Sequence, residues 1–191
     1  MIKIMAISGS TRQHSTNHQL IAAIKERYAT QAEMTLFEGL TELPHFNPDL
    51  DHEQPPAEVA AFRAQLRAAD AVLICTPEYA IGVPGSLKNA LDWTVSSMEF
   101  SQKPVGLITA GTSGVHAHKS LLGTLLIIES RMREEMQLVI PAVKTKISPE
   151  GVITHGETLT AIDRLMHSLL AVAAQPREDD AYLHPPAFHK A

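Results

Sequence analysis

The sequence predicts a three-layer, doubly wound α/β fold with a five-stranded parallel sheet of order 2-1-3-4-5 and helices on both faces. Two observations predict it. Short apolar runs alternate with longer amphipathic stretches along the chain, and several runs are nearly continuous, which is typical of parallel strands covered by helices on both faces. Five strands and five helices in strict alternation then favour right-handed crossover connections.

The first half of the chain contains two strand–helix units. Residues 2–8 form an apolar run that stops at Gly9, too short for an export signal. Apolar residues then recur every three or four positions over 17–28, the period of a helix that packs on one face. Residues 33–37 are the second strand, and the same helical period returns over 59–69. The proline-rich segment 44–56 between them is expected to be a surface loop.

The second half continues the alternation. The third and fourth strands are expected to be almost wholly apolar, and the fifth is shorter. These strands are residues 71–76, 105–110 and 137–140, and the helical periods that follow them cover residues 87–98, 121–128 and 159–173. We expect one domain over residues 1–174. Residues 175–191 are rich in proline and charge and are expected to form a tail that is mobile or docks on a neighbouring subunit.

The composition is that of a soluble globular protein. Apolar residues make up 45% and charged residues 19% of the chain, which excludes intrinsic disorder. A net charge of −5 argues against nucleic acid or an anionic membrane surface as a partner. No apolar run approaches the roughly 20 residues that span a bilayer. The single cysteine, Cys75, excludes an internal disulfide framework, and we expect a cytoplasmic protein.

A sheet of this order binds ligands beyond the carboxyl ends of its first and third strands. The loop after the first strand combines a flexible glycine, several hydroxyl groups and a fixed positive charge at a helix N-terminus, which favours a phosphate. The candidate phosphate-binding residues in this loop are Ser10, Arg12, Ser15, Thr16 and Asn17. The alternative is ordinary helix capping by Ser15 or Thr16, which leaves Arg12 unexplained. The loop is neither a dinucleotide-binding GxGxxG turn nor a Walker P-loop.

Two further loops supply the rest of a pocket. After the third strand, prolines stiffen a loop in which glycines allow a flat ligand to approach the backbone. A plain turn with Pro84 opening the next helix is the alternative. The loop after the fourth strand places two glycines among hydroxyl groups. The candidate residues are Pro77, Glu78, Tyr79 and Ala80 in the former loop and Gly111, Thr112, Ser113 and Gly114 in the latter. Together the three loops fit a phosphate joined to a planar heterocycle, such as FMN.

Two motifs resemble those of a known family. They are Gly9-Ser10-x-Arg12-x-x-Ser15-x-Asn17, and Pro77-Glu78-Tyr79 followed by Pro84-Gly85-x-Leu87-Lys88-Asn89-Ala90-Leu91-Asp92-Trp93. Over residues 2–174 the chain resembles the flavodoxin-like NADPH-dependent FMN reductases, a group that includes quinone, azo-dye and chromate reductases. Many members have Asn and Ser at the positions of Ala80 and Gly82, and this chain also departs from their Ser-Pro-Gly type of loop at residues 110–114.

The resemblance implies roles for these residues. Those of the first loop would hold the FMN phosphate, those from Pro77 to Ala80 would line the isoalloxazine, and those from Gly111 to Gly114 would close its other side. Family members are usually dimers or tetramers, so a homodimer or homotetramer with residues 86–97 near the contact is expected. Glu78 is expected to have a structural hydrogen-bonding role.

The expected activity is an FMN-dependent reduction. NAD(P)H would deliver a hydride to flavin N5, and a small acceptor would then take its place in a ping-pong order. The candidate acceptors are a quinone, a nitro or azo compound, free flavin or a metal oxyanion. No side chain need act as nucleophile or general base, so no catalytic residue is assigned. The alternatives are a flavodoxin-like electron carrier and a flavin-dependent regulatory protein; Arg12 in the phosphate loop and the modest net charge favour the reductase.

Two other groups are given structural interpretations. His116 and His118 have His-x-His spacing, but no acidic or cysteine cluster accompanies them, so no metal site is expected. Cys75 lies in an apolar strand and is expected to be an inert core residue.

Overall fold

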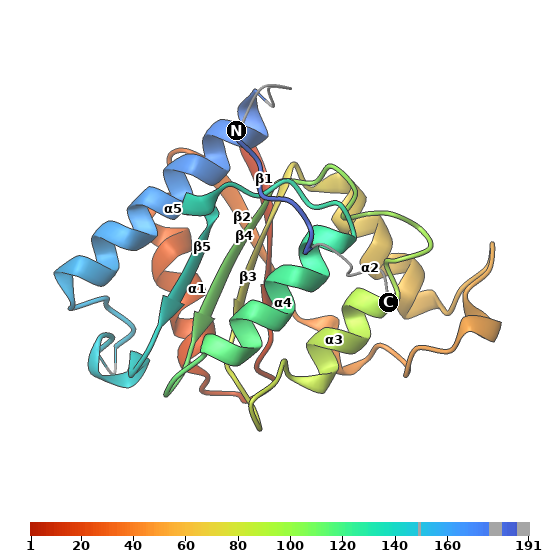
Figure 1. Ribbon diagram of the computed structural model, residues 1–191, viewed down its shortest axis with the longest axis horizontal. Helices are drawn as coiled ribbons and strands as arrows, with labels where there is room; N and C mark the ends of the chain where they lie inside the picture. Colours follow the sequence, from red (N-terminus) through yellow and green to blue (C-terminus); the bar gives the residue numbers. More distant parts are fainter. Residues whose placement is uncertain (149, 176–180, 187–191) are drawn as a thin grey trace.

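The computed structural model describes residues 1–148, 150–175 and 181–186, and it confirms the predicted three-layer α/β fold (Figure 1). Within these residues, a five-stranded sheet has the order β2-β1-β3-β4-β5, and every neighbouring pair is parallel. Its strands are β1 (Ile2–Ser8), β2 (Ala32–Phe37), β3 (Ala71–Thr76), β4 (Val105–Ala110) and β5 (Gln137–Ile140). The strand predictions are therefore confirmed, with β2 one residue longer than expected.

Five α-helices in the described part of the chain cover the sheet. They are α1 (Thr16–Arg27), α2 (Ala57–Ala68), α3 (Gly85–Asp92), α4 (Val115–Ile127) and α5 (Gly156–Ala174). One hydrophobic core lies between the sheet and helices α1 and α5, and a second lies between the sheet and helices α2, α3 and α4. Successive side chains of β1 point to opposite faces of the sheet. Ile4 and Ala6 therefore pack in the first core, and Met5 and Ile7 pack in the second.

Helix α3 is shorter than the sequence predicted. The apolar period extends to residue 98, whereas the helix ends at Asp92 and turns follow it. The carbonyl oxygen of Trp93 accepts a hydrogen bond from the Arg63 guanidinium at 2.8 Å. Downstream, Met98 has a φ of 60°, which a right-handed helix does not accommodate. The Trp93 carbonyl is therefore bonded to the side chain of the buried Arg63 at the point where the predicted helix would have continued.

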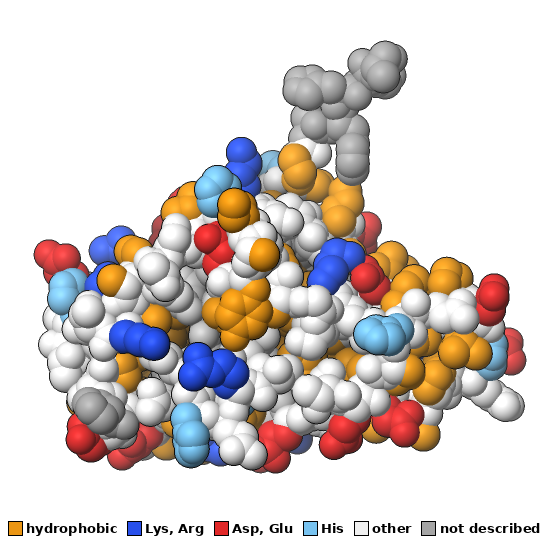
Figure 2. Space-filling view, turned by 90° about the horizontal axis from the view of Figure 1, so that it is seen from below, with side chains coloured by type: hydrophobic (Ala, Val, Ile, Leu, Met, Phe, Trp, Pro, Cys, Tyr) orange, Lys and Arg blue, Asp and Glu red, His pale blue; other side chains and the backbone are white. Residues whose placement is uncertain are grey.

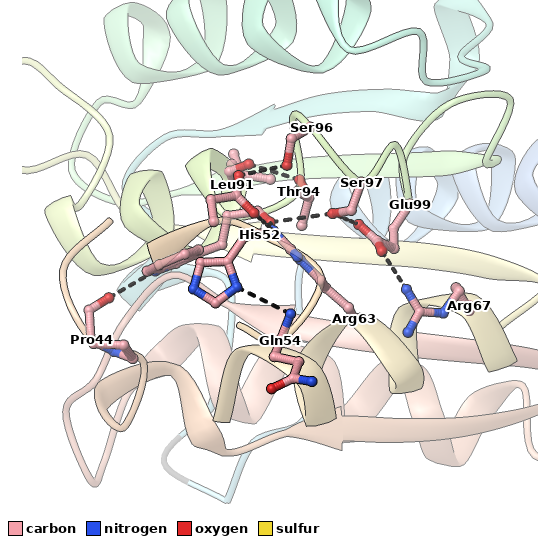
Figure 3. Close-up of polar contacts among 12 residues, drawn as sticks. Pro44, His52, Gln54, Arg63, Arg67, Leu91, Thr94, Ser96, Ser97 and Glu99 are labelled. Atoms are coloured by element: carbon pink, nitrogen blue, oxygen red, sulfur yellow. Dashed lines mark hydrogen bonds and ion pairs between the residues drawn. The ribbon is translucent and has the colours of Figure 1, made fainter. Parts of the chain in front are cut away.

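The proline-rich segment 44–56 is a surface loop that is clamped to α3 (Figure 3). The carbonyl oxygen of Pro44 accepts hydrogen bonds from the Trp93 indole at 2.8 Å and the Asn89 amide at 3.0 Å. Asp51, further along the loop, forms a 2.6 Å ion pair with Arg63 of α2, and both side chains are at most 8% exposed. Burial alone would raise the pKa of Asp51, but hydrogen bonds from Arg63 and Ser96 hold it below its ordinary value. The family-type residues Asn89 and Trp93 are therefore structural anchors.

A second ion pair lies beside this clamp. Arg67 pairs with Glu99 at 2.6 Å, and the Ser97 hydroxyl donates to the other Glu99 oxygen at 2.6 Å. Figure 3 shows these side chains converging from α2 and from the turns after α3. They fix the path of the chain between α3 and β4.

Part of the C-terminal segment packs on the same chain. The Leu183 N–H donates to the Met132 carbonyl at 2.8 Å, and the Arg131 guanidinium lies 5.8 Å from the centre of the Tyr182 ring. Residues 176–180 and 187–191 are outside the described part, so the expectation of a mobile or subunit-docking tail stays a prediction. No helix among the described residues combines the length and apolarity needed to cross a bilayer.

Candidate functional site

The three loops singled out by sequence meet at the edge of the sheet formed by the carboxyl ends of the strands. A cavity of about 290 Å³ opens there. It is lined by Ser10, Arg12, Ser15, Thr16, Asn17, Pro77, Glu78, Tyr79, Ala110, Gly111, Thr112, Ala142, Val143, Lys144 and Thr145. Ala80, Ser113 and Gly114, which sequence reasoning also placed in the site, do not line this cavity. Figure 2 views the molecule from this edge and shows Lys and Arg side chains beside an apolar patch near the middle of the face.

Gly9 lets the first loop pass close over β3. A Cβ atom at this position would lie 2.1 Å from the Thr76 hydroxyl oxygen, so no other residue fits without movement. The Gly9 N–H donates to the Cys75 carbonyl at 2.8 Å and joins the loop to β3. Cys75 itself is fully buried, and burial raises the pKa of its thiol. These contacts hold the loop at the switch point of the sheet.

Ser15 caps the helix that follows this loop. Its hydroxyl accepts a hydrogen bond from the Asn17 N–H at 3.2 Å, so the capping alternative holds for this residue. Arg12 is exposed at the rim, and within the described residues its side chain has no ion pair or hydrogen bond. The loop thus presents an unpaired guanidinium beside the positive end of α1.

Asn17 joins the first loop to the end of β4. Its side-chain nitrogen donates to the Ala110 carbonyl at 3.2 Å, and this bond fixes the orientation of the amide. The side-chain oxygen is buried and has no partner in the described structure, while the residue is only 4% exposed. An unsatisfied buried acceptor costs about 1–3 kcal/mol. A hydrogen-bond donor from a ligand in this cavity would remove that cost.

Glu78 connects the loop after β3, residues 77–84 (the β3 loop), to helix α4. Its carboxylate accepts a hydrogen bond from the Ala117 N–H at 2.8 Å. That bond, with smaller contributions from the amides of Gly114 and His116, holds the pKa of Glu78 below its ordinary value. Gly114, the N-cap of α4, has a φ of 109° and no side chain with which to cap the helix. Glu78 caps it instead, in agreement with the structural role expected from sequence.

A tight turn forms the tip of the β3 loop. Tyr79 and Gly82 exchange backbone hydrogen bonds of 3.0 and 2.9 Å, and the two residues between them, Ala80 and Ile81, have φ values of 49° and 63°. Left-handed backbone costs an L-residue about 1–2 kcal/mol. The Asn that resembling proteins carry at the position of Ala80 tolerates this conformation better. The Tyr79 hydroxyl lies 3.5 Å from that of Ser10, so this side chain spans the two switch-point loops.

The loop after β4, residues 111–114 (the β4 loop), is joined by backbone hydrogen bonds to the segment after β5. The N–H of Gly111 donates to the Ile140 carbonyl at 3.2 Å and is therefore already engaged. In return, the Gly111 and Thr112 carbonyls accept from Val143 and Ala142 at 3.1 and 3.2 Å. These bonds bring the segment after β5 into the cavity wall.

Residues 142–145 line the cavity and were not predicted from the sequence. The predicted site comprised only the loops after the first, third and fourth strands. Strand order contained the signal, because the fifth strand lies beside the fourth and ends at the same edge of the sheet. The pair Lys144-Thr145 also combines a cation with a hydroxyl group, as the first loop does.

The two neighbouring histidines do not form a metal site with other described residues. His118 is buried, and its two ring nitrogens lie 2.9 Å from the Thr109 hydroxyl and 2.9 Å from the Gln137 side-chain oxygen. Burial lowers the pKa of His118. Throughout the described part of the chain, no three His, Cys, Asp or Glu side chains gather as metal ligands do. His118 instead links α4 to β4 and β5.

Known proteins are similar to this chain in sequence and in fold. The family model described as NADPH-dependent FMN reductase matches residues 2–144. An NADH-dependent flavin reductase subunit 2 of Lactobacillus johnsonii is 31% identical, over 88% of this chain and 87% of that protein. An NAD(P)H-dependent FMN reductase of Pseudomonas aeruginosa is also 31% identical, over 88% and 93% of the two chains.

A solved structure supports the fold. The flavoenzyme NAD(P)H:(acceptor) oxidoreductase FerB of Paracoccus denitrificans superposes with a TM-score of 0.72 at 23% identity, over 91% of this chain and 98% of that one. Because the family model spans all five strands and the switch-point loops, the match confirms the resemblance found in the sequence. The chain belongs to the NADPH-dependent FMN reductase family, and it is an oxidoreductase.

Proposed function

We propose that this protein uses FMN and NAD(P)H to reduce a small acceptor, such as a quinone, a nitro or azo compound, free flavin or a metal oxyanion. One observation carries the proposal. A single cavity brings together the unpaired Arg12, the N-terminus of α1 and the two loops that Glu78 joins. The names of the relatives, which include NADH-dependent flavin reductase and NAD(P)H-dependent FMN reductase, support it.

The residues of the cavity fit FMN. A phosphate needs donors and positive charge, and Arg12, Ser10 and the start of α1 offer both. The buried, unpartnered oxygen of Asn17 needs a donor, which a ribityl hydroxyl would supply. Gly111 has no side chain, so the cavity wall beside the Glu78 backbone is open. A Cβ atom at position 111 would have one neighbour within 4 Å, the Glu78 nitrogen at 3.6 Å. A flat ring could lie against this wall.

When bound, FMN would supply the redox chemistry, by taking a hydride from NAD(P)H and passing electrons to the acceptor in a ping-pong order. The protein's part is to bind, to orient and to exclude water. Arg12 and the α1 N-terminus would hold the phosphate, and Tyr79 would lie across the two loops. Glu78 would keep the β3 and β4 loops at a fixed separation. None of these roles requires a nucleophile or a general base.

An electron carrier without nicotinamide turnover is the second candidate, because the same cavity would serve it. The proposal also includes a cytoplasmic homodimer or homotetramer with α3 near the contact. The exposed apolar residue Ile81, at 71% exposure on the tip of the β3 loop, is consistent with a partner or a substrate at this face.

The test is a spectroscopic titration. FMN is added to the purified protein, and NADH or NADPH follows under anaerobic conditions. A perturbed flavin spectrum that either nucleotide bleaches rapidly supports the reductase. Binding without bleaching supports the carrier or a regulatory protein. Absence of FMN binding would overturn both.

A further inference from the structure

We infer that Lys144 is a second cation of the phosphate subsite, so that this chain binds a phosphate dianion between Arg12 and Lys144, on opposite loops. The inference rests on the proposed function and adds to it a residue outside the family-type motifs. Lys144 belongs to a short 3₁₀ turn, Val143–Thr145, that follows β5, and it lines the same cavity as Arg12.

The turn that carries Lys144 is held in place by backbone hydrogen bonds. Ala142 and Val143 donate to the carbonyls of the β4 loop, at 3.2 and 3.1 Å. The Thr145 N–H and hydroxyl both lie 2.9 Å from the Ala142 carbonyl, and Val143 is buried. Ala142 has a φ of 49°, a left-handed conformation that is unusual for a residue other than glycine. Lys144 is therefore presented to the cavity by a turn anchored to the loop proposed to close over the flavin.

Lys144 is also electrostatically unpaired. Within the described residues its ammonium group has no ion pair or hydrogen bond, whereas Lys88 pairs with Asp92 and Lys103 donates to the Ala69 carbonyl. The carboxylate among the cavity-lining residues is that of Glu78, which is engaged with the N-terminus of α4. The cavity thus keeps two uncompensated cations in a chain whose net charge is −5. A cavity of this charge concentrates anions.

A phosphate monoester is the anion that suits two such cations. It carries about −1.5 to −2 charges at pH 7. The Arg12 guanidinium can bind two of its oxygens as a fork, and the Lys144 ammonium can act as a point charge on the third. The ordinary alternative is a solvated surface lysine. Lys146, two residues further on, is half-buried and lies outside the cavity lining, so it serves as the control for loss of a lysine charge near this turn.

The test compares FMN with riboflavin, which lacks the phosphate. Dissociation constants are measured by flavin fluorescence for the wild type, Lys144→Gln, Lys144→Arg and the control Lys146→Gln. We expect Lys144→Gln to weaken FMN binding about tenfold, the effect of one charge-assisted contact, and to leave riboflavin binding unchanged. Lys144→Arg should retain most of the affinity, and Lys146→Gln should match the wild type. The affinity of Lys144→Gln for FMN should also depend less on salt.

Three outcomes would overturn the inference. FMN affinity that is unchanged in Lys144→Gln would show that the lysine does not contact the phosphate. An equal loss for FMN and riboflavin would point to a distorted loop. A raised KM for NADPH with unchanged FMN affinity would assign the lysine to the nicotinamide nucleotide. Failure of the wild type to bind FMN would instead overturn the proposed function, so the two failures are distinguishable.

Discussion

The carboxylate of Glu78 lies 2.8 Å from the backbone nitrogen of Ala117, so a residue of the β3 loop caps the helix that follows the β4 loop. This one contact joins the two loops that are proposed to enclose the flavin ring. It also explains why an acidic residue can line a cavity for an anion. The positive end of α4 compensates its charge.

The first prediction concerns the pH dependence of this cap. Glu78→Gln removes the charge, so the variant should be less stable than the wild type at neutral pH. The pKa of Glu78 lies below its ordinary value, about 4.3 in an unfolded chain. The stabilisation is therefore complete above that value and is lost as the pH falls through the pKa of the folded state. Urea unfolding at pH 7, 5, 4 and 3 should show the difference between the two proteins shrinking on acidification.

Glu33→Gln is the control for this comparison, because Glu33 is exposed on β2. Its effect on the free energy of unfolding should be small at every pH. A difference between wild type and Glu78→Gln that stays constant down to pH 3 would show that the cap does not depend on charge.

The second prediction concerns Arg12. Arg12→Ala removes a charge-assisted contact with the FMN phosphate worth roughly 1.5–3 kcal/mol. FMN affinity should fall more than tenfold, while riboflavin affinity and the thermal unfolding temperature stay near those of the wild type. Equilibrium titrations with both flavins provide the measurement. Unchanged FMN affinity would remove Arg12 from the site.

The third prediction concerns the strained turn at the tip of the β3 loop. Ile81 has a φ of 63° and is 71% exposed. Ile81→Gly relieves left-handed strain of about 1–2 kcal/mol and costs roughly 0.5–1 kcal/mol of added chain entropy. The free energy of unfolding should therefore not fall, and it should rise by up to about 1.5 kcal/mol.

Val152→Gly is the matched control, because Val152 is 60% exposed in a loop and does not have a positive φ. It should lose about 0.5–1 kcal/mol. A loss of stability in Ile81→Gly would mean that the isoleucine makes contacts worth more than the strain. Steady-state kinetics on Ile81→Gly would show whether the Ile81 side chain also affects the KM for the acceptor.

The sequence predicted the sheet well because buried parallel strands are nearly continuous apolar runs, as β3 and β4 are. It overextended α3 because apolar periodicity continues past Asp92, whereas the bond from Arg63 to the Trp93 carbonyl is a tertiary contact that no local pattern reveals. Lys144 was missed because the predicted site included only the loops after the first, third and fourth strands, although the fifth strand ends at the same edge of the sheet. The position of Lys144 in the cavity depends on backbone bonds between the β4 and β5 loops, which join residues about 30 positions apart.

The last prediction tests the contacts that hold the 44–56 loop on α2 and on the end of α3. Arg63 and Asp51 form a buried ion pair, and Arg63 also binds the Trp93 carbonyl. Removal of one partner of a buried pair typically costs about 3–5 kcal/mol, because the other charge is left uncompensated. Arg63→Met should therefore lower the free energy of unfolding by about 3 kcal/mol or more.

Lys88→Met is the control for charge loss alone, since the pair of Lys88 with Asp92 is exposed and should contribute no more than about 0.5 kcal/mol. The double variant Arg63→Met with Asp51→Asn should lose less than the sum of the two single variants, because no buried charge then remains unpaired. Chemical denaturation of the four proteins and the wild type measures these differences. If the losses in the double variant simply add, the ion pair is not coupled, and the stability of the clamp rests on the hydrogen bonds to Pro44 and Trp93.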